Sequence, residues 1–184
     1  MTYMTEAEEP LLTLDDYRIG FKTERGLAKA GDGVSLTLKR GQTLGIVGEA
    51  GSGKTTLGMA ILRLVKSMGG VTFNGFRLHE MTARKVRDLR RDLQIVFQDP
   101  FGSLNPRMKV GDIIGEPLRV HGKGGDRGTY RARIQQLMDL VGLLPAMAER
   151  NPHEFSGGQR QRIGIARALA LEPSLLICDE PVSA

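Results

Sequence analysis

The sequence predicts an α/β fold whose central sheet is mainly parallel. Short apolar runs of strand length alternate along the chain with segments whose apolar residues recur at helical spacing. One apolar run leads into a glycine-rich loop that opens a helix, and another ends in two adjacent carboxylates. The order of these patterns favours strands and helices that alternate around one sheet.

The composition indicates a globular protein with no membrane span of its own. The 184 residues suit one domain or most of one. No stretch approaches the roughly 18 consecutive apolar residues that a membrane helix needs, and the acidic, polar opening is unlike a signal or transit peptide. If the protein works at a membrane, a partner must recruit it there.

The single cysteine and the basic clusters each have a structural explanation. Cys178 lies in an apolar run and is expected to be a buried core residue; one cysteine supports neither a disulfide framework nor a zinc cluster, which fits a reducing cytoplasm. The formal charge is +5, with basic clusters at 84–91 and 160–167. Because apolar residues interleave them at helical spacing, solvated helix faces are favoured over a nucleic-acid surface.

The amino-terminal half predicts strands on both sides of a helix. Alternating residues predict half-solvated strands at Leu11–Phe21 and Val34–Lys39. The β-branched run Thr43–Val47 predicts a buried strand, and after the glycine loop a helix is expected over Lys54–Lys66. Beyond the break at residues 69–70, the pattern predicts in order a strand with a turn, a basic helix and a buried strand: Val71–Phe76, Thr82 to about Asp92, and Leu93–Phe97.

The carboxyl-terminal half predicts helices followed by one strand. Gln98–Pro106 carries two prolines and is predicted as a loop. Helices are expected from about Val110, over Tyr130–Val141 and over Ser156–Leu171. Pro173 ends the last helix, and Leu175–Cys178 predicts a buried strand.

The glycine-rich loop predicts a phosphate-binding site. Gly48-Glu49-Ala50-Gly51-Ser52-Gly53-Lys54-Thr55 fits the pattern G-x-x-x-x-G-K-[ST] without a gap. Glycines allow successive backbone N–H groups to face a phosphate, and the following helix offers its positive end to the same anion. Lys54 would reach the β- and γ-phosphates, and the Thr55 hydroxyl would bind Mg²⁺. The loop indicates a nucleoside triphosphate and leaves ATPase, GTPase and kinase open.

The acidic strand end predicts the metal-binding and water-activating groups. Asp179 is the candidate for holding Mg²⁺, directly or through water, and Glu180 for orienting and polarising the attacking water. A turn aided by Pro181 could bring both carboxylates to one site. Alone, two acids at a strand end more often cap or face solvent; beside a phosphate loop, the chemical role is favoured.

A second glycine-rich motif opens the basic helix near residue 156. In Phe155-Ser156-Gly157-Gly158-Gln159 the serine is a good helix cap, and the glycines bare backbone N–H groups at a positive helix end. Alone, this would be an ordinary glycine-containing cap. With the phosphate loop it becomes a second phosphate-binding surface in the same chain.

This combination resembles the ABC ATPase family. Its signature LSGGQ appears here as FSGGQ, and the acidic strand end follows the signature helix as it does in the family. The family's Q-loop glutamine matches Gln98. Its adenine-stacking aromatic residue matches Phe21, with Tyr17 as the alternative, and Ala50 stands where the family often has serine.

The resemblance runs from about Leu11 to Ala184 and is finer in two segments. Residues 98–107 and 152–162 look like those of oligopeptide and dipeptide importers, a branch that also includes transporters of nickel, glutathione and peptide antibiotics. It implies one incomplete ABC ATPase domain: a P-loop NTPase core with an antiparallel β subdomain over about 11–98 and 172–184, and a helical signature subdomain over about 99–171.

The resemblance implies an ATPase that uses ATP and Mg²⁺. Glu180, Gln98 and Lys54 would be catalytic. Mg²⁺ would be bound by Thr55, Gln98 and Asp179. The nucleotide would be bound by the adenine-stacking residue, the phosphate loop and the signature: Phe21, Gly48, Glu49, Ala50, Gly51, Ser52, Gly53, Lys54, Thr55, Thr56, Ser156, Gly157, Gly158 and Gln159.

The family also implies the partners and the location. Two ATPase domains, identical or paralogous, would dimerise head to tail, so that Ser156 and Gly158 serve the partner's nucleotide. Two membrane permease subunits and an external substrate-binding protein complete the importer, and no nucleic acid is expected. The chain would lie peripherally on the cytoplasmic face of the inner membrane.

The chain stops where the family's D-loop begins. The D-loop aspartate and a later histidine that contacts the γ-phosphate are absent from residues 1–184. We therefore expect these residues alone to hydrolyse ATP weakly or not at all, and a piece of a longer protein is favoured over a non-hydrolysing remnant. A soluble ABC ATPase acting on nucleic acid or ribosomes is the main alternative function, and a nucleotide-binding regulator without transport is a third.

Overall fold

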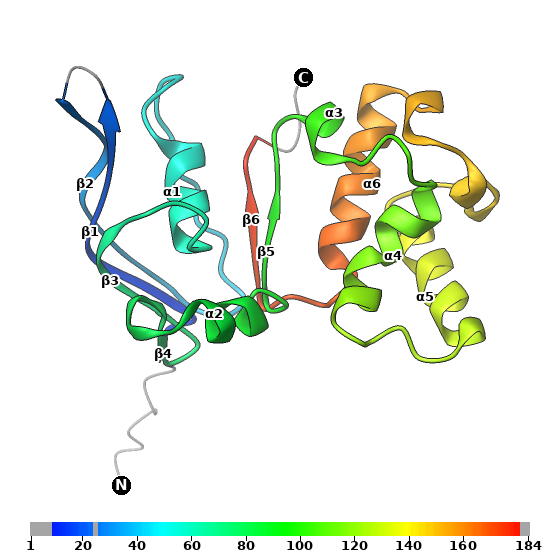
Figure 1. Cartoon of the computed structure of the whole chain (residues 1–184), viewed down its shortest axis with the longest axis horizontal. Coiled ribbons are helices and arrows are strands. Elements are labelled where there is room, and N and C mark those ends of the chain that lie inside the picture. Colours follow the sequence, from blue (N-terminus) through cyan, green and yellow to red (C-terminus); the bar gives the residue numbers. More distant parts are fainter. Residues whose placement is uncertain (1–8, 24–25, 181–184) are drawn as a thin grey trace, which may run out of the picture. The chain divides into compact units, whose positions relative to one another are not determined.

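The computed structural model describes residues 9–23 and 26–180, which fall into two compact units (Figure 1). The first unit is Met1–Asp88 and the second is Leu89–Ala184. The first holds an antiparallel sheet and the second a parallel one. The α/β class predicted from the sequence is therefore confirmed.

The first unit is built on an antiparallel sheet of order β2-β1-β3-β4. Its strands are β1 (Leu12–Thr23), β2 (Gly26–Leu38), β3 (Met68–Phe73) and β4 (Phe76–Arg77). The alternation in the sequence sets the two faces, because neighbouring side chains of a strand point to opposite sides. Leu12, Leu14 and Phe73 are buried, whereas Thr13 and Thr72 remain partly exposed.

Helix α1 (Lys54–Ile61) lies against β1 and β2. Tyr17 joins this helix to the sheet, since its hydroxyl donates a hydrogen bond of 2.7 Å to the carbonyl oxygen of Ala60. The helix ends before the predicted Lys66. The remainder of the unit is η1 (Leu78–Glu80) and α2 (Ala83–Leu89), the basic helix that the sequence predicted.

The prediction of a strand at Thr43–Val47 is wrong. Residues 42–49 have no regular secondary structure, and Leu44, Ile46 and Val47 are 47%, 48% and 95% exposed. A strand needs a neighbour to accept and donate its backbone hydrogen bonds, and no described strand pairs with this segment. The apolar run has the right composition for a buried strand, but nothing in the described residues buries it.

The second unit packs helices beside a two-stranded parallel sheet. Strands β5 (Leu93–Val96) and β6 (Leu175–Cys178) pair in register from Leu93 with Leu175 to Val96 with Cys178. The helices between them are α3 (Pro100–Ser103), α4 (Val110–Val120), α5 (Arg127–Leu140), η2 (Pro145–Glu149), η3 (Pro152–Glu154) and α6 (Gly157–Leu169).

The apolar faces of the second unit's longer helices form its core. This core includes Ile113 and Ile114 of α4, Leu137 and Met138 of α5, and Ile163 of α6, each at most 2% exposed. The apolar residues that recur at helical spacing in the sequence therefore form the side of each helix that faces the core. Among the helices of residues 9–23 and 26–180, none has both the length and the apolar composition of a membrane span.

Two other predictions about the second unit need correction. The segment Gln98–Pro106 was predicted as a loop, but it contains the short helix α3. Cys178 was predicted to be buried, but it is exposed. It ends β6, whose only described strand partner is β5, so no described strand pairs with the other edge of β6. Partial burial still raises the pKa of its thiol.

Candidate functional site

The phosphate loop lies in the first unit, between residues 48 and 55, and folds back over its own lysine. The ammonium of Lys54 donates to the carbonyl oxygens of Gly48 and Glu49, at 2.9 Å each. The Ser52 amide donates to the carbonyl oxygen of Glu49 at 3.2 Å, which closes a tight turn. The cation is thus held at the loop, where it adds to the positive end of α1 as a site for an anion.

Backbone conformation explains the glycines of this loop. Gly51 and Gly53 have φ of 79° and 96°, in the left-handed region that favours glycine. Gly53 is the N-cap residue of α1, and a Cβ atom there would stand 2.1 Å from the carbonyl oxygen of Ala30 on β2. Close packing of loop on strand therefore excludes any side chain at position 53.

The two candidates for stacking on a nucleotide base differ in how exposed their rings are. Phe21 on β1 is 39% exposed. Tyr17 is 1% exposed, and its hydroxyl lies 2.6 Å from Ser67 Oγ as well as bonding Ala60. Tyr17 is therefore a core residue with no face available to a ligand, and Phe21 stays the prediction.

In the second unit, the parallel pairing of β5 and β6 brings Gln98 to Glu180. The backbone amide of Asp179 continues the ladder by donating to the carbonyl oxygen of Val96 at 2.9 Å. Beyond it, Gln98 Nε2 donates to Glu180 Oε2 at 2.8 Å. Because both strands run in the same direction, their carboxyl ends deliver an amide and two carboxylates to one edge.

Glu180 leaves the strand through an unusual backbone conformation. Its φ is 44°, in the left-handed region that costs a residue with a side chain of the order of 1 kcal/mol or more. The chain bends at Asp179 and Glu180, at the end of the strand where the sequence predicted a turn. Pro181, which was expected to aid it, lies outside the described residues.

The signature motif is a well-formed start to α6. Ser156 Oγ accepts from the amide of Gln159 at 3.3 Å, and Gln159 Oε1 accepts from the amide of Ser156 at 3.0 Å, which together make a capping box. Phe155, just before it, is 4% exposed and belongs to the core of the second unit. The motif is thus anchored on one side and capped at the helix start.

Neither backbone conformation nor packing within the described chain requires glycine at the two glycine positions of the signature. Both are exposed, neither has a positive φ, and a Cβ atom at either position would meet nothing within 4 Å. Glycine in a helix is less favourable than alanine by up to about 1 kcal/mol. Space outside the chain, rather than packing within it, therefore accounts for Gly157 and Gly158.

Side chains of α6 that follow the signature were missed as functional candidates. The 160–167 cluster was interpreted as a solvated helix face. Arg160 donates to the carbonyl oxygen of Pro152 at 2.8 Å, Arg162 to that of Val141 at 3.2 Å, and Arg167 to that of Ser103 at 2.6 Å. These arginines bind the ends of neighbouring helical segments, and nothing in the linear pattern distinguishes such a role from solvation.

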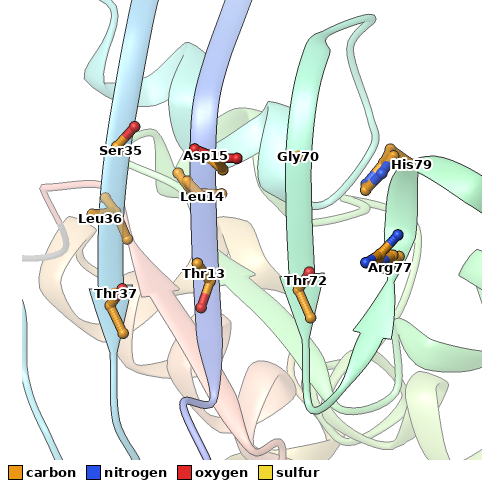
Figure 2. Close-up of a pocket in the computed structure, with 10 residues that line it drawn as sticks. All are labelled: Thr13, Leu14, Asp15, Ser35, Leu36, Thr37, Gly70, Thr72, Arg77 and His79. Atoms are coloured by element: carbon orange, nitrogen blue, oxygen red, sulfur yellow. The ribbon is translucent and has the colours of Figure 1, made fainter.

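The first unit also carries a hollow on the exposed face of its sheet. Figure 2 shows residues of β1, β2 and β3 lining it, with Arg77 and His79 at one side. None of its lining residues belongs to the phosphate loop. Within the described residues, no group of three or more histidine, cysteine, aspartate or glutamate side chains could hold a metal ion.

Comparison with known proteins gives one consistent family. The family described as ABC transporter matches residues 32–183. The oligopeptide transport ATP-binding protein OppF of Escherichia coli strain K12 is 50% identical over 194 residues, covering 100% of this chain and 58% of that protein. The glutathione import ATP-binding protein GsiA of the same strain is 52% identical over 186 residues, covering 96% of this chain and 29% of that protein.

The solved structures agree with the sequence relatives. The ATP-binding cassette MJ0796, as a dimer in a post-hydrolysis state bound to ADP and Pi, matches with a TM-score of 0.86 and 29% identity over 94% of this chain and 75% of that one. CbiO1 of Clostridium perfringens, part of the ABC transporter complex cbiONQ, matches with a TM-score of 0.77 and 26% identity over 95% of this chain and 66% of that one. The chain spans a little over half the length of the OppF relatives.

Proposed function

The chain belongs to the ABC transporter family, and from this premise we propose that it binds and hydrolyses ATP to power the import of peptides or related small solutes. The observation that carries the proposal is the presence of three separate structural elements suited to ATP chemistry. These are the lysine-bearing phosphate loop, the Gln98–Glu180 pair and the glycine-opened signature helix. The similarity to oligopeptide and glutathione import proteins supports the class of solute.

ATP binding is assigned to the phosphate loop and Phe21. The loop amides and the start of α1 would receive the phosphates, and Lys54 would move its donors from the loop carbonyls to phosphate oxygens. The exposed ring of Phe21 would stack on adenine. The side chains proposed to hold Mg²⁺ are Thr55, Gln98 and Asp179, which all offer the oxygen ligands that this ion prefers. When bound, the ion neutralises phosphate charge.

Hydrolysis is assigned to Glu180, which Gln98 orients. Glu180 would accept a hydrogen bond from the attacking water and polarise it, and the amide of Gln98 would keep the carboxylate in a defined rotamer. Positioning and charge stabilisation supply most of the catalysis in phosphoryl transfer, so the fixed direction of this carboxylate matters more than its basicity.

The signature is assigned to the ATP bound by a second ATPase domain. Gly157 and Gly158 leave open space at the positive end of α6, and a phosphate could approach its backbone amides closely there. The similarity to dimeric cassette structures supports a pair of ATPase domains, and the pair would be arranged head to tail. Hydrolysis would then require both domains, and closing and reopening of the pair would shift two permease subunits between their states.

The proposed setting is the cytoplasmic face of the inner membrane, where the chain would be held by two permeases and served by an external substrate-binding protein. The test is ATP-dependent peptide uptake into vesicles that contain the complete assembly, made with the product of the complete reading frame. We expect uptake to require ATP and to be lost with Lys54→Ala, while Gln135→Ala on the exposed surface of α5 leaves it unchanged. Uptake that persists with Lys54→Ala would contradict the proposal.

A further inference from the structure

We propose that Gln161 is a positioning residue that couples the signature helix to Gln98. It lies on α6, five residues after Ser156, and is not part of the signature motif. The proposal rests on the proposed ATPase function, because it assigns a role to Gln161 through Gln98 and Glu180.

The side chain of Gln161 reaches the residue before Gln98. Its Nε2 donates to the carbonyl oxygen of Phe97 at 3.3 Å, in a partly buried setting. This carbonyl belongs to the peptide that also contains the backbone nitrogen of Gln98, so the bond fixes the plane of that peptide. Gln98 in turn donates to Glu180 at 2.8 Å. Gln161 is therefore connected to the Glu180 carboxylate through two hydrogen bonds, the Phe97–Gln98 peptide and the side chain of Gln98.

A second side chain of α6 holds the other end of the same segment. Arg167 donates to the carbonyl oxygen of Ser103, the last residue of α3, at 2.6 Å. The guanidinium is partly buried, and this burial lowers its pKa. Since a buried cation that loses its partner is costly, this attachment resists separation.

A hydrogen bond within the segment 97–103 joins two of its own residues. The amide of Gly102 donates to Asp99 Oδ2 at 3.1 Å, and α3 lies beside α6. Residues 97–103 are consequently held to α6 at both ends and braced in the middle. A displacement of α6 carries this segment with it.

The position of Gln161 on α6 lets a change at the start of this helix reach Gln98. Ser156 and Gln161 are separated by about 7.5 Å along a helix that rises 1.5 Å per residue, so an event at the start of α6 reaches Gln161 within two turns of a rigid element. When a partner's nucleotide engages the start of the helix, Gln161 passes the shift to Phe97 and hence to the direction of the Gln98 amide. The direction of the Glu180 carboxylate then responds to the nucleotide that the partner domain holds.

The test compares Gln161 variants in the product of the complete reading frame. Gln161→Glu keeps the size of the side chain and removes its donor, whereas Gln161→Lys keeps a donor at the end of the chain. Gln135→Ala on the exposed surface of α5 is the matched control. ATP affinity is measured with a fluorescent ATP analogue, kcat and KM by phosphate release, and folding by thermal denaturation.

We expect Gln161→Glu to lower kcat about tenfold, within the range that a displacement of about 1 Å in a catalytic group can cost. The ATP dissociation constant and melting temperature should stay within error of the control. Gln161→Lys should recover at least half of the lost kcat.

Three results would overturn the proposal. The first is a kcat for Gln161→Glu equal to that of Gln135→Ala. The second is a loss of kcat accompanied by a matching loss of ATP affinity or of melting temperature. The third is an equal loss of kcat in the glutamate and lysine variants. A wild-type protein that binds no ATP would instead contradict the proposed function itself, and that result is read before any variant is compared.

Discussion

Replacing Gly158 by alanine should make the protein more stable and less active. A Cβ atom at this position meets nothing within 4 Å, and its backbone φ is not positive, so alanine fits the existing helix. Alanine exceeds glycine in helix propensity by about 1 kcal/mol in a helix interior. Gly158 is in the first turn, where fewer backbone hydrogen bonds depend on it, so we expect a gain of roughly 0.5 kcal/mol.

The same methyl group should interfere with the approach of a partner's phosphate. Overpacking a close contact costs about 1–3 kcal/mol, and about 1.36 kcal/mol corresponds to a tenfold change in rate. ATP hydrolysis by Gly158→Ala should therefore fall on the order of 5- to 150-fold. ATP binding to the phosphate loop of the same chain should not change, since the signature serves the other nucleotide in this account.

Gly164→Ala is the matched control for this prediction. Gly164 lies in the middle of the same helix, and a Cβ atom there also meets nothing within 4 Å. It should gain about 1 kcal/mol of unfolding free energy, measured by urea denaturation, without losing hydrolysis. If Gly158→Ala hydrolyses ATP as fast as Gly164→Ala, the inferred close approach at the signature is wrong. A loss of stability in Gly158→Ala would show that packing within the chain requires this glycine.

Two further predictions concern the fold. Tyr130→Phe should leave the unfolding free energy unchanged or raise it by up to about 1 kcal/mol, because its buried hydroxyl has no hydrogen-bond partner among the described residues. Tyr17→Phe should lose about 1–2 kcal/mol, because it removes the hydrogen bonds that its hydroxyl forms with the carbonyl oxygen of Ala60 and with Ser67 Oγ. Urea denaturation of both variants checks the pair, and equal changes would contradict it. Asp126 caps α5, and bonds from the amide and hydroxyl of Thr129 hold its pKa below the ordinary 3.8. Its contribution to stability is present above pH 3.8 and lost as the pH falls through the lowered pKa of the folded state. Asp126→Asn keeps the cap but should flatten this part of the acid denaturation profile, and an unchanged profile would refute the assignment.

The sequence was sufficient where a pattern depends on local chemistry. The predicted strand Leu175–Cys178 matches β6 residue for residue, and the predicted start of α1 at Lys54 is also correct. The serine cap before α6 was visible for the same reason, since Ser156 and Gln159 satisfy each other within one turn. The helix start and the cap need only neighbours in the chain, whereas β6 forms where predicted because β5 supplies its backbone hydrogen-bond partners.

Features that depend on distant neighbours were not predictable in this way. Thr43–Val47 has the composition of a buried strand, but a strand forms only beside another, and no described strand pairs with it. Cys178 was expected inside for its apolar surroundings and is exposed at the end of a strand with one partner. Similarly, Gln161 and Arg167 are polar residues on a helix, and only the fold shows which carbonyl oxygens they reach.

The substitution Glu180→Gln is the most direct test of the proposed role of Glu180 in hydrolysis. The substitution keeps the size of the side chain and removes its charge, so its binding of ATP should equal that of wild type. Both proteins, made from the complete reading frame, are compared by equilibrium ATP binding and by phosphate release in a single turnover. We expect the ATP affinity of Glu180→Gln to be unchanged and its phosphate release to fall to background. Phosphate release at the wild-type rate would remove Glu180 from the reaction and contradict the account.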